Sequence, residues 1–305
     1  MALNIFILVG PTGIGKTEVA IELARKYDLD IISADSRQIY KYMDIGTAKP
    51  LSVVRDCVCF HLIDHITPDI LYSAVDFGRD CEKVIKELTL KKGKFILVGG
   101  SGLYLKALFK PFFSAPPRDL KLRKRLESET TEKLYERLEN VDPISAQRIK
   151  PQDRQRIIRA LEIYEQTRKP MSEQITQTSK AEFLPYYVGL TMDRKKLHEK
   201  INNRFDDMIE KGLVNEVKNL LRLGYSEKDN ALNGIGYLEI IRFLNQEISL
   251  MEAIYLAKNR SCQYAKRQIT WFKKVEGIKW IEYTTLNETV LKVSKEYEKY
   301  LMTIE

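Results

Sequence analysis

Along its first hundred residues the chain alternates between short apolar runs and amphipathic stretches. Apolar, β-branched runs at 5–9, 30–33, 57–63 and 94–98 predict four buried strands. Apolar residues recur at helical spacing after the first run and before the fourth. This alternation predicts a parallel α/β sheet core flanked by helices.

The pattern changes at 114–117, where charged helical periodicity replaces the alternation of strands and helices. No strand signal returns until the apolar run at 185–191. We therefore expect a core domain formed by residues 1–113 and 186–305, interrupted by a helical insertion domain over 114–185.

The composition is typical of a soluble globular chain with a polyanionic partner. Of the 305 residues, 44% are hydrophobic and 30% are charged, and the formal net charge is +8. This charge favours nucleic acid as a partner, although ordinary surface charge gives the same total. The amino-terminal apolar run is too short for a signal peptide or a membrane span, so we expect a cytoplasmic protein without membrane contact. Nothing demands a dimer, and a monomer is expected.

The cysteines and histidines are not spaced as a metal site. The four cysteines form no C-x-x-C pair, and no histidine lies at zinc-finger spacing from them, so zinc is not expected. Cys57 and Cys59 alternate along a strand-like run and are interpreted as small buried residues on one face. The three histidines, His61, His65 and His198, lack a neighbouring nucleophile, and no catalytic role is assigned to them.

The stretch between the first strand and the first helix fits the phosphate-loop pattern G-x-x-x-x-G-K-[ST]. Its residues are Gly10, Pro11, Thr12, Gly13, Ile14, Gly15, Lys16 and Thr17. Glycines let backbone N–H groups surround an anion, and the start of a helix adds partial positive charge. Lys16 would reach the distal phosphate, and Thr17 would offer its hydroxyl to Mg²⁺. A chance glycine-rich turn is the alternative, but both flanks favour the phosphate loop.

Two further strands end in polar or glycine-rich turns at the expected phosphate-loop edge. Asp35-Ser-Arg-Gln38 follows the second strand, and Gly99-Gly-Ser-Gly-Leu-Tyr104 follows the fourth. Asp35 could be a helix cap, but the density of polar residues favours a functional role. The fourth strand lacks the Asp that many nucleotide hydrolases use to hold magnesium, although Asp64 or Asp35 could replace it. Because the usual set of residues is incomplete, nucleotide hydrolysis is not favoured.

Basic residues gather in two later segments. Residues 148–159 hold five basic side chains against one acidic, and residues 258–274 hold six against none. In the second segment Arg260, Tyr264 and Arg267 share a helical face, an arrangement that suits phosphates and stacked bases. A solvated helix face is the alternative for the first segment.

Taken together, these motifs resemble the tRNA dimethylallyltransferase family, whose members prenylate the adenine immediately 3′ of the anticodon. The resemblance runs nearly end to end. Besides the segments 10–17, 35–38 and 99–104, the matching motifs are Met43-Asp-Ile-Gly-Thr-Ala-Lys-Pro50, Arg156-Ile-Ile-Arg-Ala-Leu-Glu162, Ile235-Gly-Tyr237 and Ala265-Lys-Arg-Gln-Ile-Thr-Trp271. The chain ends without the finger extension of eukaryotic relatives, so the bacterial enzymes are the closer likeness.

The resemblance implies a function for each motif. The phosphate loop would hold dimethylallyl diphosphate, with Mg²⁺ at Thr17. Asp35 matches the general base toward the adenine amino group, and Arg204 matches an arginine that helps to hold the diphosphate, so Asp35, Thr17 and Arg204 are the expected catalytic residues. Residues at positions matching tRNA contacts are Asp35, Ser36, Arg37, Gln38, Ser101, Arg123, Gln155, Arg156, Ile157, Ile158 and Arg159.

The chain departs from the family pattern at a few positions. Ser101 stands where the family usually has threonine, Leu238 replaces a basic residue, and Ser261-Cys262 replaces Thr-Arg. The loss of two cations bears on contacts with the tRNA backbone. Two other functions stay open: a phosphate-loop kinase that uses ATP on a small molecule, and a nucleotide-gated RNA-binding protein without chemistry.

Overall fold

The computed structural model describes residues 3–109, 116–175 and 182–303. The chain divides into unit 1, residues 1–109 and 182–305, and unit 2, residues 110–181. The predicted boundaries were 113/114 and 185/186; the second falls inside a strand that begins at Phe183.

Unit 1 contains one parallel sheet, six-stranded within the described ranges, in the order β3-β2-β4-β1-β5-β6. Its strands are β1 Leu3–Val9, β2 Asp30–Ala34, β3 Phe60–His61, β4 Phe95–Gly99, β5 Phe183–Thr191 and β6 Lys279–Glu282. Because every pair is parallel, the carboxyl ends of the strands meet at one edge, where ligands bind in open α/β sheets.

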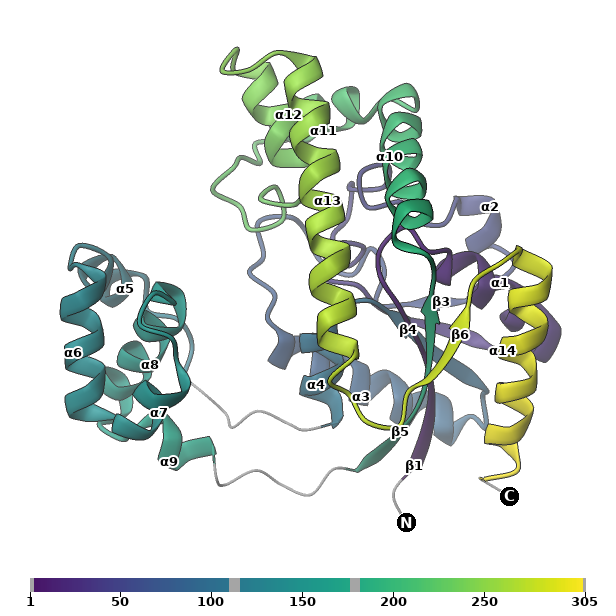
Figure 1. The fold of residues 1–305 in the computed structure, drawn as a ribbon, viewed down its shortest axis with the longest axis horizontal. Helices are drawn as coiled ribbons and strands as arrows, with labels where there is room; N and C mark the ends of the chain where they lie inside the picture. The colour runs from purple at the N-terminus through teal and green to yellow at the C-terminus, as the bar shows by residue number, and fades with distance from the viewer. Residues whose placement is uncertain (1–2, 110–115, 176–181, 304–305) are drawn as a thin grey trace. The chain divides into compact units, whose positions relative to one another are not determined.

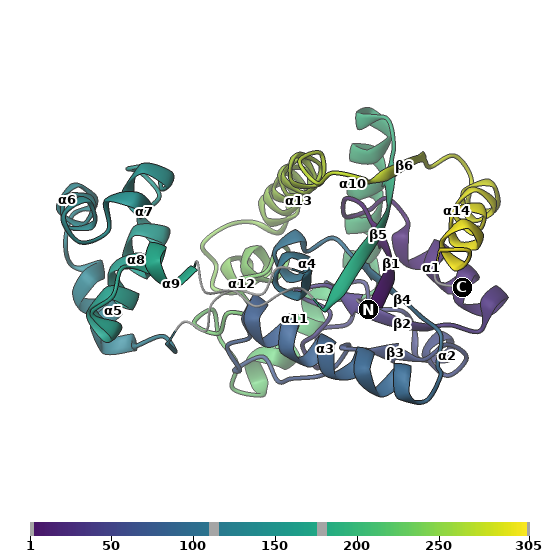
Figure 2. The same cartoon turned by 90° about the horizontal axis from the view of Figure 1, so that it is seen from below.

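Helices cover both faces of this sheet (Figures 1 and 2). Those of unit 1 are α1 Lys16–Tyr27, α2 Ser52–Arg55, α3 Ala74–Leu90, α4 Gly102–Phe109, α10 Arg194–Glu210, α11 Leu213–Arg222, α12 Tyr237–Leu244, α13 Leu250–Phe272 and α14 Leu286–Leu301. Phe6 and Leu8 of β1 share a core cluster with residues of α1 and α14, whereas Ile5 and Ile7 share one with α3 and α4. The predicted phosphate-loop-type parallel α/β fold is confirmed.

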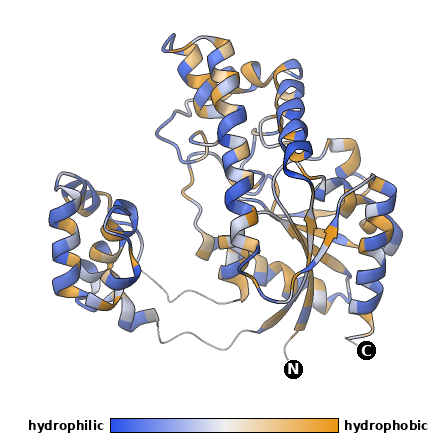
Figure 3. Ribbon diagram, viewed as in Figure 1, coloured by the Kyte–Doolittle hydropathy of each residue, from blue (hydrophilic) through white to orange (hydrophobic). Residues whose placement is uncertain are grey.

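The central strand β1 gives a clear signal in the sequence because it is buried on both faces. All residues from Ile5 to Val9 are fully buried, so both faces of β1 are apolar and the run is continuous. The strands form the most hydrophobic part of unit 1, and the helices are hydrophilic on their outer sides (Figure 3). Helix α3 begins as predicted, with a capping box between Ser73 and Asp76.

The prediction for residues 57–63 was wrong in extent and orientation. Only Phe60 and His61 form a strand, and Cys57 and Cys59 are exposed rather than buried. The intervening Val58 is 5% exposed and occupies the interior instead. The larger apolar side chain takes the buried side of this edge segment, which turns both thiols outward.

Unit 2 is helical throughout its described residues. Its helices are α5 Leu120–Glu127, α6 Thr131–Val141, α7 Pro143–Arg148, α8 Arg154–Thr167 and α9 Met171–Ile175. They enclose a hydrophobic core of their own, built on Leu126, Leu134, Leu138 and Leu161. In the parts of the chain that are described, no helix has both the length and the apolar composition that a bilayer crossing requires.

Candidate active site

The phosphate loop joins β1 to α1, in the context that the sequence predicted. Gly13 and Gly15 adopt φ angles of 78° and 108°, which other residues rarely take. A Cβ at Gly13 would lie 2.7 Å from Ile201, and one at Gly15 would lie 2.8 Å from Tyr283. No side chain caps α1, so its first backbone N–H groups face the loop and are suited to an anion.

Lys16 lies in the loop, and among the described residues no carboxylate pairs with it. Its Nζ donates a hydrogen bond to the Pro11 carbonyl at 2.8 Å. Burial lowers the Lys16 pKa to about 8; nearby Asp35 opposes the shift and Arg204 adds to it. A buried ammonium held by one carbonyl is energetically costly, and a phosphate group would relieve that cost.

Arg204 of α10 brings a second cation to the loop. Its Nε is buried and has no hydrogen-bond partner among the described residues. Burial lowers the Arg204 pKa, while Glu18 and Asp35 act in the opposite direction. Lys200, one turn earlier, donates to the Ile14 carbonyl at 3.3 Å and lies over the Tyr283 ring. The loop thus lies against an incompletely paired arginine, which suits a polyanionic ligand.

Asp35 begins the turn after β2 with one carboxylate oxygen bound and the other free. Its Oδ1 accepts hydrogen bonds from the backbone N–H groups of Arg37, at 2.8 Å, and Gln38, at 3.3 Å. Its Oδ2 accepts none from the residues that the structure describes. The capping alternative therefore accounts for one oxygen only, and the second can accept a proton.

One cavity of about 320 Å³ brings Asp35 and Arg204 together with part of the phosphate loop, whereas Lys16 and Thr17 are not among its lining residues. Thr12 and Gly13 of the loop, Asp35, and Arg204 line it. Its apolar wall consists of Ile201, Phe205, Met208 and Ile235. The first three lie on the same face of α10 as Arg204, because residues three and four positions apart are neighbours on a helix. The cavity therefore combines anion-binding groups, a free carboxylate oxygen and an apolar wall.

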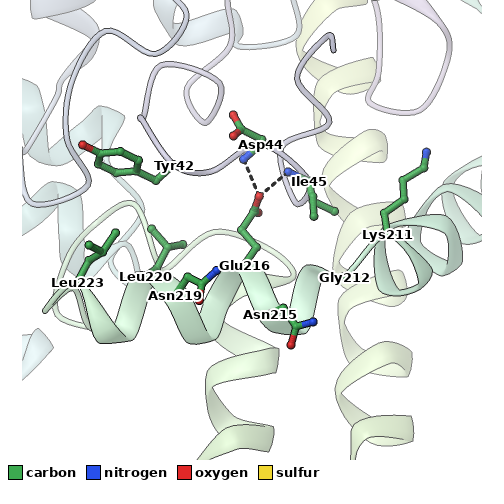
Figure 4. Close-up of a pocket in the computed structure, with 10 residues that line it drawn as sticks. All are labelled: Tyr42, Asp44, Ile45, Lys211, Gly212, Asn215, Glu216, Asn219, Leu220 and Leu223. Atoms are coloured by element: carbon green, nitrogen blue, oxygen red, sulfur yellow. Dashed lines mark hydrogen bonds between the residues drawn. The ribbon is translucent and has the colours of Figure 1, made fainter. Parts of the chain in front are cut away.

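A second, larger pocket, of about 460 Å³, lies under the loop at 42–45 against α11 (Figure 4). No residue of the phosphate loop lines it, and Asp35 does not. Its central group, Glu216, accepts hydrogen bonds from the N–H groups of Asp44, Ile45 and Gly46 at 2.7–3.1 Å, and from Tyr237 at 2.6 Å. This carboxylate fastens the loop whose next residues, Gly46 and Thr47, line the smaller cavity.

The Glu216→Gln variant is expected to lose about 1–3 kcal/mol of unfolding free energy and to turn over more slowly. The glutamine amide offers one acceptor where the carboxylate offers two, so loop N–H groups or the Tyr237 hydroxyl lose their partner. Urea unfolding and initial rates measure the two effects. Glu210→Gln is the matched control, because Glu210 is exposed at the end of α10. Equal stability of the two variants would contradict this role.

Gln268 of α13 is a site residue that sequence reasoning missed. Its side chain is buried; Oε1 accepts from the Thr12 N–H at 2.7 Å and Nε2 donates to the Gly100 carbonyl at 3.0 Å. It thus joins the phosphate loop to the glycine turn after β4. Its only sequence signal was a position within the motif 265–271.

The polar residues after β2 and β4 interlock with each other. The Ser101 hydroxyl accepts from the Ser36 N–H at 3.2 Å. Arg37 donates to the carbonyls of Asn230 and Ala231. The side chain of Gln38 is buried, and its amide nitrogen donates to the carbonyls of residues 47 and 48. Arg37 and Gln38 therefore hold neighbouring loops in place. Ser36 and Arg37 also line the cavity.

The predicted basic face of α13 borders the cavity. Arg260, Tyr264 and Arg267 all line it, and the Arg267 guanidinium lies 5.7 Å from the Tyr264 ring centroid. Burial raises the Tyr264 pKa, and the Asp35 carboxylate adds to the shift. Arg260 pairs with the buried Glu239. An aromatic ring and a cation thus lie beside the candidate base.

Asp64 is not free to hold a metal ion. It forms ion pairs with Lys49 and Arg55, and Lys49 also donates to the Tyr40 carbonyl at 2.6 Å. Asp64 therefore anchors the loop after residue 43. Asp35 is therefore the candidate carboxylate beside the phosphate loop, and the Thr17 hydroxyl is an oxygen ligand of the kind that Mg²⁺ prefers.

The expected tRNA-contacting residues of unit 2 differ in availability. Glu162 is fully buried and accepts from Arg123, Arg159 and the Asp119 N–H. Arg123 also donates to Gln155 at 2.7 Å. These side chains are held within unit 2.

Arg156 of α8, in contrast, is exposed over 71% of its side chain and pairs with Asp153 at 3.3 Å. Ile157 and Ile158 are fully buried in the core of unit 2. The prediction that these two contact tRNA is therefore wrong for their side chains, because their positions on the helix point inward.

The chain is similar to known proteins over nearly its whole length. A family model described as IPP transferase matches residues 38–275. The tRNA dimethylallyltransferase of Carboxydothermus hydrogenoformans is 45% identical over 290 residues, covering 92% of this chain and 93% of that protein. Two solved structures are similar to this chain. The full-length tRNA isopentenylpyrophosphate transferase of Bacillus halodurans has a TM-score of 0.72 and 33% identity, with 100% of both chains covered. A eukaryotic dimethylallyltransferase acting on tRNA has a TM-score of 0.78 and 29% identity, with 94% of this chain and 75% of that one covered. The resemblance found in the sequence is confirmed: the chain belongs to the IPP transferase family.

Proposed function

We propose that the chain transfers a dimethylallyl group from dimethylallyl diphosphate to N6 of the adenine 3′ of the anticodon in tRNAs, and releases diphosphate. The observation that carries this proposal is the composition of one cavity, which joins a phosphate loop, a free carboxylate oxygen and an apolar wall. The curated relatives named as tRNA dimethylallyltransferases support the same reaction.

The diphosphate would lie on the phosphate loop, residues Gly10 to Thr17. Backbone N–H groups, Lys16 and the unpartnered Nε of Arg204 would share its charge. These groups stabilise the leaving diphosphate as its bond to the allylic carbon breaks, because they are already oriented toward the developing charge. The Thr17 hydroxyl would hold Mg²⁺, which when bound supplies further charge neutralisation on the diphosphate.

The dimethylallyl group would pack against the apolar wall of α10. Ile201, Phe205 and Met208 lie beside Arg204 on that helix, so the tail would extend from the diphosphate along one helical face. Burial against these side chains keeps water from the allylic carbon, which carries positive charge in the transition state.

Asp35 would act as the general base. As the N6–carbon bond forms and the carbon–oxygen bond to diphosphate breaks, Oδ2 would accept the proton that N6 loses. The Oδ1 hydrogen bonds to the turn N–H groups hold the carboxylate in position meanwhile. The adenine must leave its stack to reach Asp35, at a cost of a few kcal/mol. Tyr264 and Arg267 border the cavity and offer a ring and a cation to the flipped base.

Of the expected tRNA-contacting arginines of unit 2, Arg156 is the most exposed. We expect Arg156→Ala to reduce the slope of log affinity for tRNA against log salt by roughly one unit, with unfolding free energy unchanged. Salt-dependent binding measurements test this, with the exposed Lys133→Ala on α6 as control. Arg159→Ala is less informative, because it also removes a partner of the buried Glu162. An unchanged slope in Arg156→Ala would mean that this helix face contacts only solvent.

The function is tested by incubating the chain with Mg²⁺, unmodified tRNA and dimethylallyl diphosphate. The RNA is then digested to nucleosides, and their masses are measured by mass spectrometry. A prenylated adenosine that needs the diphosphate donor and is indifferent to ATP supports the proposal. Consumption of ATP with a small-molecule acceptor, and no prenylated product, would favour the kinase instead. Binding of tRNA without either reaction would favour an RNA-binding protein.

A further inference from the structure

Three potential metal ligands converge at the start of β2 and β3. Their ligand atoms, the Asp30 carboxylate, the Cys59 thiol and the His61 ring nitrogen, all lie within 4.8 Å of one another. His61 Nε2 lies 2.7 Å from Asp30 Oδ2 and 3.5 Å from Cys59 Sγ. This cluster is outside the catalytic cavity, and the reaction above makes no use of it.

The register of the sheet brings the three together. Ile31 pairs with Phe60 and Ile32 with His61, and the Ile31 N–H donates to the Cys59 carbonyl at 2.9 Å. Alternate residues of a strand share a face, so Cys59 and His61 lie on one side of β3, and Asp30 lies on that side of β2. Asp30 is the first residue of its strand, so the cluster occupies the amino edge of the sheet, opposite the phosphate loop.

His61 Nε2 faces both the Asp30 carboxylate and the Cys59 sulfur. Zinc binds cysteine as the thiolate, so its binding would displace the thiol proton and let one cation contact all three groups. The donor set of thiolate, imidazole and carboxylate is the one that zinc accepts in proteins.

One of the two distances agrees with a tetrahedral zinc ion, and the other requires a shift of the carboxylate. Zinc bonds of about 2.3 Å to sulfur and about 2.0–2.1 Å to nitrogen separate these two atoms by about 3.5 Å, the distance observed between Cys59 Sγ and His61 Nε2. The carboxylate oxygen, now within hydrogen-bond distance of Nε2, would need to retreat by roughly 0.7 Å to make its own zinc bond. The side chains of Asp30 and His61 are 31% and 25% exposed, so an ion can reach them from solvent.

We propose that Asp30, Cys59 and His61 form a zinc site that fastens the edge strand β3 to β2, with the fourth coordination position open to water. Strand β3 is two residues long, so it depends on side-chain links more than a longer strand does. It leads to Asp64, which anchors the loop at 43–50 through Lys49. The sequence did not reveal this site because its ligands are divided between two strands.

The test titrates Zn²⁺ and Co²⁺ into reduced, metal-stripped, full-length protein that carries no histidine tag. We expect one equivalent of Zn²⁺ in competition with a chromogenic chelator, a rise in melting temperature, and a cobalt–thiolate charge-transfer band. Cys59→Ser should remove the band. Each of the variants Cys59→Ser, His61→Ala and Asp30→Asn should weaken zinc binding by more than about tenfold. Loss of a residue that only hydrogen-bonds to a metal ligand already lowers metal affinity by about 10- to 100-fold.

Cys57→Ser is the matched control, because Cys57 is an exposed thiol two residues away and outside the cluster. It should keep the band and the affinity. Absence of a thiolate band in the native protein would overturn the proposal, as would its loss in Cys57→Ser or zinc affinity that His61→Ala leaves unchanged. Circular dichroism of each variant separates loss of ligand from loss of fold.

Discussion

Asp35→Asn is expected to lower the rate of prenyl transfer by about 100- to 10,000-fold, the usual contribution of a general base, while tRNA affinity stays nearly unchanged. Asparagine keeps an oxygen for the N–H groups of Arg37 and Gln38, so the turn after β2 is preserved. It cannot accept the proton from N6. Asparagine is therefore a sharper substitution than alanine, which also removes the turn contacts.

Single-turnover transfer and tRNA binding, measured on the same preparation, separate these two effects. Asp207→Asn is the matched control, because Asp207 is exposed on α10 and is not among the residues that line the cavity. Near-normal turnover in Asp35→Asn would remove Asp35 from the role of base. Loss of tRNA binding in parallel with activity would indicate a positioning role instead.

Lys16→Ala should weaken capture of the diphosphate and slow transfer by about 100- to 1,000-fold, the range seen when one donor to a developing negative charge is removed. Lys26→Ala, on the exposed side of the same helix, should leave both unchanged. Donor saturation curves and the limiting rate are the measurements. A Lys16→Ala enzyme that saturates with donor as the native one does would contradict phosphate binding by this loop.

The pKa of Lys16 gives the same prediction a pH signature. Burial lowers this pKa to about 8 in the free protein, and a bound diphosphate would raise it again. Well below pH 8 the lysine is protonated with or without donor, so its titration leaves donor affinity unchanged. Above pH 8 binding must take up a proton, and the donor dissociation constant should rise by up to about tenfold per pH unit. Lys16→Ala should lose this dependence.

The elements around the phosphate loop were predictable because their signals are local. Strand β1 is buried on both faces and reads as a continuous apolar run, and the loop glycines occupy positions where a Cβ would clash. The edge segment at Cys57–Ile63 was misinterpreted because a run with period-two alternation does not indicate which of its two faces is buried. Packing of Val58 decides that, and packing is a tertiary property.

The parts of the site that sequence reasoning missed depend on distant pairings. Gln268 and Thr12 are 256 positions apart, and Glu216 reaches the loop at 44–46 from α11. Neither residue lies in a local pattern that indicates its partner. Ile157 and Ile158 illustrate the opposite error, in which a whole segment was assigned to RNA although helical periodicity buries two of its five positions.

The proposed reaction adds one dimethylallyl group to a single adenine of tRNA. The most direct measurement is to react unmodified tRNA with dimethylallyl diphosphate and Mg²⁺, cleave the RNA with a base-specific ribonuclease and find by fragment mass which nucleotide has gained the dimethylallyl group. We predict a single addition, on the adenine directly 3′ of the anticodon, absent with Asp35→Asn and unaffected by ATP. An addition elsewhere in the tRNA, or no addition while ATP is consumed, would contradict the proposed reaction.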